Sequence, residues 1–113
     1  MTYTIYHNPR CSKSRQTLTL LQQHNLDINI VEYLKNPLTA SQIEQLINLL
    51  KINAIDIVRT KEPEFKQLNL TTASEQQLIE ALVTTPKLLE RPIVVSGNKA
   101  CIGRPPENIL ALL

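Results

Sequence analysis

The residues best suited to chemistry lie between positions 3 and 17, around Cys11. An alternating apolar run that contains Tyr3 and Ile5 ends at Asn8-Pro9, and a helical pattern begins just after the cysteine. Cys11 is therefore predicted at a strand-to-helix junction, where unpaired backbone N–H groups carry partial positive charge and stabilise a thiolate. The chemistry that this placement indicates is that of a cysteine nucleophile.

Polar and cationic side chains surround this cysteine in the sequence. Arg10, Lys13 and Arg15 supply positive charge, which lowers the pKa of a cysteine. Ser12 and Ser14 can donate hydroxyl hydrogen bonds to the sulfur or to an incoming anion, and His7 can act as a further donor or charge partner. The alternative is that Cys11 is a small apolar filler of the core, but a filler would need apolar neighbours.

Three arginines fall where predicted elements begin or end: Arg59, Arg91 and Arg104. A guanidinium presents a rigid fork of donors that fits tetrahedral oxyanions, so these side chains are candidates for an oxyanion site with Cys11. The other interpretation is a solvated surface charge or an ion pair with a nearby glutamate. Spacing in the sequence leaves both interpretations open.

Composition and length describe a small globular protein. With 113 residues and a hydrophobic content of 42%, we expect one domain, residues 1–113, with a core of its own. The net charge of +2 is too small to indicate nucleic-acid or membrane binding. The start shows no signal-peptide pattern and no apolar run reaches about 18 residues, which predicts a cytoplasmic protein. In that reducing compartment, two cysteines indicate chemistry rather than a structural disulfide.

The elements that must position these side chains begin with a predicted strand at 2–7, a helix at 12–24 and a strand at 27–33, which together form a βαβ unit. Residues 36–90 are predicted to be helical and free of strands. Capping boxes at Thr39–Gln42 and Ser74–Gln77 open two helices there, and shorter helical pieces are expected at 54–58 and 64–68. This stretch is predicted to be an insert in a smaller sheet domain.

The last part of the chain predicts a hairpin and a final helix. Strands at 93–96 and 99–102 flank Gly97-Asn98, and the helix after Gly103 is expected to bury Ile109, Leu110 and Leu113. The order βαβ, helical insert at about 36–90, ββα is that of an α/β, thioredoxin-like four-stranded mixed sheet. In such a fold Cys11 faces the loop with Arg91-Pro92, and we predict a cis peptide bond there.

Patterns of possible metal ligands and of a second redox thiol are weaker than the Cys11 pattern. His7, Cys11, His24 and Cys101 match no compact metal motif, so we expect no metal. Ser14 stands where a redox C-x-x-C motif would have its second thiol, so disulfide turnover would need an external thiol. Cys101, inside a predicted strand, is interpreted as a packed thiol, and an approach to Cys11 through the fold is left open.

Several stretches together resemble the ArsC-type arsenate reductase family, in its chromosomal branch. They occur in family order and cover nearly the whole chain: Tyr6-His-Asn-Pro-Arg-Cys-Ser-Lys-Ser-Arg15, Glu32-Tyr-Leu34, Val58-Arg-Thr-Lys-Glu62, Glu90-Arg-Pro-Ile-Val-Val95 and Ile102-Gly-Arg-Pro-Pro-Glu107. The chain departs from the plasmid-borne members at Ser12-Lys13, where they have Gly-Thr, and at Arg10, where they have a small residue.

The resemblance implies a thioredoxin-like fold with a helical insert, and reduction of arsenate to arsenite with glutathione as co-substrate and glutaredoxin as partner. We also expect no bound cofactor, no metal and a monomer. By position, Cys11 is similar to the family's nucleophile. Arg59, Arg91 and Arg104 are similar to its oxyanion-binding arginines, and His7 and Ser14 to the residues that hold the thiolate.

Two other functions are compatible with the same fold. One is a glutathione-dependent thiol reductase without arsenate activity, in which the arginines would bind glutathione carboxylates. The other is an RNA polymerase-binding regulator similar to Spx. Many such regulators carry a C-x-x-C switch, which Ser14 interrupts here.

Overall fold

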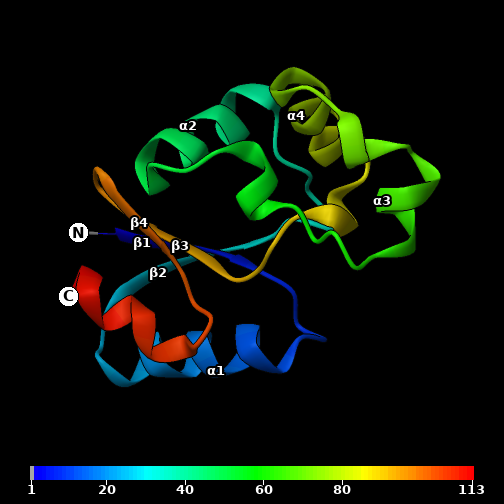
Figure 1. The fold of residues 1–113 in the computed structure, drawn as a ribbon. Coiled ribbons are helices and arrows are strands. Elements are labelled where there is room, and N and C mark those ends of the chain that lie inside the picture. Colours follow the sequence, from blue (N-terminus) through cyan, green and yellow to red (C-terminus); the bar gives the residue numbers. More distant parts are fainter. Residues whose placement is uncertain (1) are drawn as a thin grey trace. The chain divides into compact units, whose positions relative to one another are not determined.

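The computed structural model describes residues 2–113, which divide into two compact units (Figure 1). The first unit contains the chain up to Asn36 together with Arg91–Leu113, and the second unit is Pro37–Glu90. The second unit contains helices, and none of the four strands of the described chain lies in it. It corresponds to the helical insert that the sequence predicts at about residues 36–90, which is thus confirmed.

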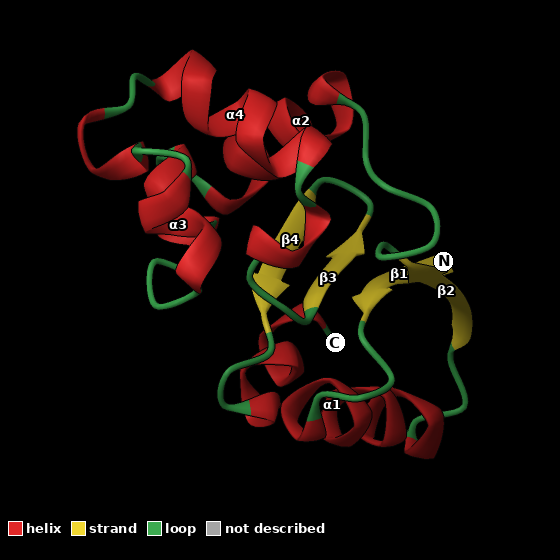
Figure 2. Ribbon diagram, turned by 90° about the vertical axis from the view of Figure 1, so that its right-hand side faces the viewer, coloured by secondary structure: helices red, strands yellow, loops and turns green. Residues whose placement is uncertain are grey.

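A four-stranded mixed sheet forms the centre of the first unit (Figure 2). Its strands are β1 (Thr2–His7), β2 (Asp27–Glu32), β3 (Ile93–Ser96) and β4 (Lys99–Ile102), in the order β2-β1-β3-β4. β1 pairs in parallel with β2 and antiparallel with β3, and β3 pairs antiparallel with β4. The predicted α/β, thioredoxin-like arrangement is therefore confirmed.

One face of this sheet is covered by α1 (Ser12–Gln23) and by the 3₁₀ helix η4 (Pro106–Leu112), which lie on the same side of the strands in Figure 1. Side chains alternate between the two faces of a strand, so Tyr3 and Ile5 of β1 point the same way. With Val94 of β3 they form a buried cluster with Leu21 of α1 and Ile109 of η4. This cluster is the core of the first unit.

The final helix differs from its prediction. Ile109 is fully buried as expected, but Leu110 and Leu113 are 46% and 48% exposed. The reason is the helix type, because a 3₁₀ helix has three residues per turn and places residues i, i+3 and i+6 on one side. Pro106, Ile109 and Leu112 therefore face inward, with Pro106 buried and Leu112 packed against the cluster.

Both predicted capping boxes are present in the second unit. The Thr39 hydroxyl accepts from the Gln42 amide before α2 (Ala40–Leu50), and Ser74 and Gln77 repeat the arrangement before α4 (Glu75–Thr84). α2 and α4 pack against each other. The remaining helices of this unit are η1 (Ala54–Ile57), α3 (Pro63–Gln67), η2 (Leu70–Thr72) and η3 (Pro86–Leu88).

Candidate functional site

Cys11 lies at the junction that the sequence predicts, immediately before α1. Its backbone N–H donates to the Asn8 carbonyl at 3.0 Å, and its own carbonyl accepts from the Arg15 amide at 3.0 Å. The first bond closes the turn after β1, and the second is the first bond of the helix. Cys11 as a residue is 8% exposed, and it stands at the N-terminus of the helix.

The surroundings of this sulfur favour the thiolate. Burial acts to raise the pKa of Cys11, but the backbone N–H groups of Ser14 and Lys13 and the guanidinium groups of Arg91 and Arg104 act against it. Together they hold this pKa below its ordinary value. Both amides belong to the first turn of α1, where backbone N–H groups carry partial positive charge and stabilise a thiolate.

Arg104 lies within hydrogen-bonding range of the sulfur. Its Nη1 lies 3.8 Å from Cys11 Sγ and 3.4 Å from the Arg91 carbonyl oxygen. The Arg91-Pro92 bond is cis, which confirms that prediction, and the Arg104-Pro105 bond is also cis, which the sequence analysis did not predict. The structure thus brings Arg91 and Arg104 to the end of the sheet where Cys11 lies.

A close packing contact at Gly103 holds the segment that carries Arg104. The Gly103 amide donates to the Pro92 carbonyl at 2.9 Å, and the Thr17 hydroxyl lies 3.3 Å from the Gly103 carbonyl oxygen. A β carbon at Gly103 would lie 2.6 Å from Thr17 Oγ1 and 2.9 Å from Pro92 Cγ. Only glycine fits this position without a shift of its neighbours.

Asn108 fixes the same segment from η4. Its Nδ2 donates to the carbonyl oxygens of Ile102 at 3.3 Å and Arg104 at 3.1 Å. The sequence analysis missed Thr17, Gly103 and Asn108 as positioning residues. Gly103 carried a usable signal, because the chain has two glycines and the other, Gly97, is explained by the hairpin turn.

His7 and Ser14 form a buried pair beneath the first turn of α1. His7 Nδ1 lies 2.6 Å from Ser14 Oγ, which also accepts from the Asn8 amide at 3.0 Å. Burial lowers the pKa of His7; Arg15 acts in the same direction and Glu32 against it. A neutral His7 can accept the Ser14 hydroxyl proton at Nδ1, an arrangement that ties the end of β1 to the turn whose amides face the sulfur.

Arg59 belongs to the second unit. Its Nη1 lies 2.6 Å from Glu62 Oε1, and its backbone amide donates to the Leu88 carbonyl at 2.7 Å. Lys87 Nζ is a second cation near this carboxylate, 3.5 Å from Glu62 Oε2. The ion pair that the sequence analysis weighed for Arg59 is therefore present, and its role toward an oxyanion stays a prediction.

Cys101 is half-buried in β4 and packs against the core cluster of the first unit. Burial raises the pKa of its thiol to about 11. At neutral pH this thiol is therefore protonated almost completely. Both cysteines are free rather than disulfide-bonded.

Residues 2–113 contain neither a candidate metal cluster nor a candidate membrane-spanning helix. No group of three or more histidine, cysteine, aspartate or glutamate side chains in this part of the chain could hold a metal ion. None of the helices described here is long and apolar enough to cross a membrane.

Comparisons with known proteins cover nearly the whole chain. A model of the ArsC family matches residues 6–112. YfgD of Escherichia coli strain K12, an uncharacterized protein, is 49% identical over 96% of this chain and 94% of its own length. The arsenate reductase of Haemophilus influenzae is 40% identical over the full length of both chains. A solved arsenate reductase structure from Vibrio cholerae superimposes with a TM-score of 0.96 at 40% identity, covering 100% of this chain and 98% of that one.

Proposed function

The chain belongs to the ArsC family, and on that premise we propose that it reduces arsenate to arsenite through a covalent bond between arsenic and Cys11. Several similar relatives carry the name arsenate reductase. The observation that carries the proposal is the contact between Cys11 and Arg104. Cys11 stands at the start of α1 with a lowered thiol pKa, and its Sγ lies 3.8 Å from Arg104 Nη1.

The proposed reaction begins with attack of the Cys11 thiolate on arsenic. One arsenate oxygen leaves as water, and an S–As(V) bond forms. Arg91 and Arg104 supply N–H donors for the remaining oxygens, since guanidinium groups bind tetrahedral oxyanions well. The sequence prediction adds Arg59 as a third donor.

An external thiol must then deliver the electrons. Ser14 stands where a second active-site thiol would be, and the pKa of Cys101, raised to about 11 by burial, makes that residue a poor nucleophile at neutral pH. Glutathione condenses with the arsenic adduct and displaces a second water. A glutaredoxin thiol attacks the glutathione sulfur and forms a mixed disulfide with it. The electron pair of the bond between arsenic and glutathione stays on arsenic, which becomes As(III). Hydrolysis of the remaining bond to Cys11 releases arsenite and the Cys11 thiolate.

His7 and Ser14 have a positioning role in this scheme. Their contact at 2.6 Å holds the turn between β1 and α1, and so it holds the amides of Lys13 and Ser14 near the sulfur. Neither residue needs to touch the substrate for this effect. The proposed reaction uses no bound cofactor and no metal, it can proceed in a monomer, and its thiol reductants place it in the cytoplasm.

The test is a coupled assay with arsenate, glutathione, glutaredoxin, glutathione reductase and NADPH. We expect arsenate-dependent NADPH consumption, its loss in Cys11→Ser, and its retention in Cys101→Ser as the matched thiol control. Turnover of a glutathione mixed disulfide without any dependence on arsenate would instead support the thiol reductase alternative.

A further inference from the structure

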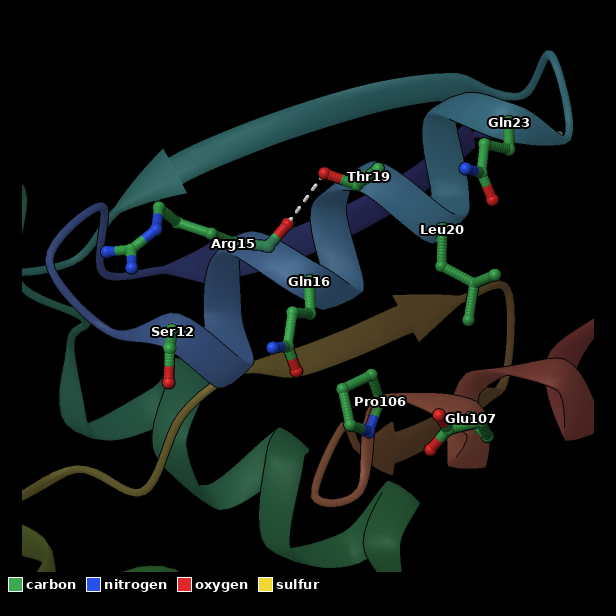
Figure 3. A pocket seen from close by; sticks show the side chains of 8 residues that line it. All are labelled: Ser12, Arg15, Gln16, Thr19, Leu20, Gln23, Pro106 and Glu107. Carbon is green, nitrogen blue, oxygen red and sulfur yellow. Dashed lines mark hydrogen bonds between the residues drawn. The ribbon is translucent and has the colours of Figure 1, made fainter.

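A groove runs along the exposed side of α1 (Figure 3). It encloses about 450 Å³, a volume typical of small-molecule sites. On α1 it is lined by two adjacent rows of residues spaced four apart, which are Ser12, Gln16 and Leu20 in one row and Arg15, Thr19 and Gln23 in the other. Pro106 and Glu107, at the start of η4, form the opposite wall.

One end of the groove begins beside the proposed reaction site. Ser12 follows Cys11 directly, and Pro106 is separated from Arg104 by one residue. The contact between Cys11 and Arg104 therefore joins the segments from which both walls start. From Ser12 to Gln23 the helix rises roughly 16 Å, and a fully extended tripeptide spans roughly 11 Å, so a tripeptide fits within the length of the groove.

The lining combines both charges with neutral donors and acceptors. Figure 3 shows Gln16 and Leu20 on the side of α1 toward Pro106 and Glu107, while the Arg15 guanidinium turns back toward the loop before the helix. There Arg15 Nη1 donates to the Pro9 carbonyl at 2.9 Å. This bond uses one of the five N–H donors of the guanidinium. Such a groove suits a short peptide with a carboxylate and an ammonium group.

We propose that this groove binds the thiol co-substrate, a short acidic peptide of the glutathione type. This inference rests on the proposed function. Cys11 requires the ligand thiol at the Ser12 end, and the carboxylate of the C-terminal arm pairs there with Arg15. The γ-glutamyl arm lies along the groove, so that its ammonium group, the ligand's only cation, pairs with the Glu107 carboxylate on the opposite wall.

The test is an amide NMR titration of Cys11→Ser, which cannot form a disulfide with the ligand, using glutathione and N-acetylglutathione. Glutathione should shift the amides of α1 that line the groove. Glu107→Gln should weaken glutathione binding roughly two- to fivefold, the range of an exposed ion pair, and should leave N-acetylglutathione binding unchanged. Gln16→Ala should weaken both ligands roughly threefold through a lost hydrogen bond.

Matched controls lie on the same kinds of surface. Gln22 is exposed on α1 outside the groove, and Glu80 is exposed on α4; Gln22→Ala and Glu80→Gln should change neither affinity. Equal losses in the Gln16 and Gln22 variants would overturn the proposal, as would loss of both ligands in Glu107→Gln or shifts confined to other parts of the chain. The titration contains no arsenate, so groove binding without arsenate reduction would contradict only the proposed function.

Discussion

Thr17 and Gly103 are 86 residues apart in the chain, yet a β carbon added at Gly103 would lie 2.6 Å from Thr17 Oγ1. This contact sets the distance between α1, which begins next to Cys11, and the end of β4, which leads directly to Arg104. Cys11 and Arg104 can meet at 3.8 Å because their elements pack this closely. The glycine therefore positions the arginine without touching the sulfur.

Gly103→Ala should destabilise the protein by about 1–3 kcal/mol, the usual cost of overpacking. Thr17→Ala in the same chain should recover part of that loss, because it removes Oγ1 and Cγ2, two of the three atoms nearest to the added methyl group, and leaves Pro92 Cγ in place. Urea unfolding of the two single variants and the double variant measures this coupling.

Gly97→Ala is the matched control for this pair. Gly97 has a φ of +61° but nothing within 4 Å of the position that a β carbon would take. Its substitution strains the hairpin backbone, and Thr17→Ala should give no recovery there. Strict additivity at Gly103 would show that the steric contact with Thr17 does not govern this junction.

Arg104→Ala should raise the pKa of Cys11, because it removes one of the cations that stabilise the thiolate. Arg91→Ala should act in the same direction, while Arg104→Lys should keep part of the effect. Alkylation of Cys11 by iodoacetamide against pH gives the pKa directly. For arsenate turnover we expect kcat/KM to fall about 10- to 100-fold in Arg104→Ala, the value of a charge-assisted hydrogen bond.

Arg10→Ala serves as the control for these arginine variants. Arg10 precedes Cys11 in the chain and is exposed, but it is not among the groups that lower the pKa of this thiol. Its alkylation midpoint should match that of the unchanged protein. A midpoint that moves with Arg10 and stays fixed with Arg104 would mean that charge next to Cys11 in the sequence, rather than charge gathered by the fold, stabilises the thiolate.

Local patterns in the sequence predicted the elements of this fold well. The capping boxes before α2 and α4 and the Gly97-Asn98 turn depend on residues within a few positions of one another. The final helix was predicted less well, since the rows of apolar residues did not distinguish three residues per turn from 3.6. Leu110 and Leu113 consequently turned out exposed.

The site depends on contacts that no local pattern contains. The approach of Arg104 to Cys11 requires the β3–β4 hairpin, the packing of Gly103 on Thr17 and the hydrogen bonds of Asn108, which come from different elements. Sequence spacing could identify the arginines as candidates but could not show that two of them converge. The family resemblance supplied that expectation, because it compared whole motifs rather than single positions.

The buried His7 should make the protein less stable as the pH falls. Burial lowers the pKa of His7 in the folded state, with Arg15 adding to this effect and Glu32 opposing it. The unfolded chain therefore binds more protons in the interval below the ordinary histidine value of about 6.5. The free energy of unfolding is therefore undiminished above the unfolded-state pKa of about 6.5, and it falls as the pH drops toward the lower pKa of His7 in the folded state.

Urea unfolding between pH 7.5 and pH 5 would measure this loss. His7→Asn keeps a polar group beside Ser14 but removes the titration, so its stability should vary less with pH in this range. His24→Asn, at an exposed position on the end of α1, should retain the full pH dependence. Parallel curves for the unchanged protein and His7→Asn would contradict the assignment of this pH dependence to His7.

The two cysteines should react at very different pH. Dipoles and cations hold the pKa of Cys11 below its ordinary value, whereas burial raises the pKa of Cys101 to about 11. Limited iodoacetamide at pH 7 should therefore label Cys11 at least tenfold faster, because the thiolate is the reactive form. Peptide mass spectrometry of the labelled protein measures the ratio, and Cys101→Ser should leave the Cys11 rate unchanged. Equal labelling, or faster labelling of Cys101, would show that burial of Cys11 outweighs the charges around it, and the nucleophile would have to be sought elsewhere.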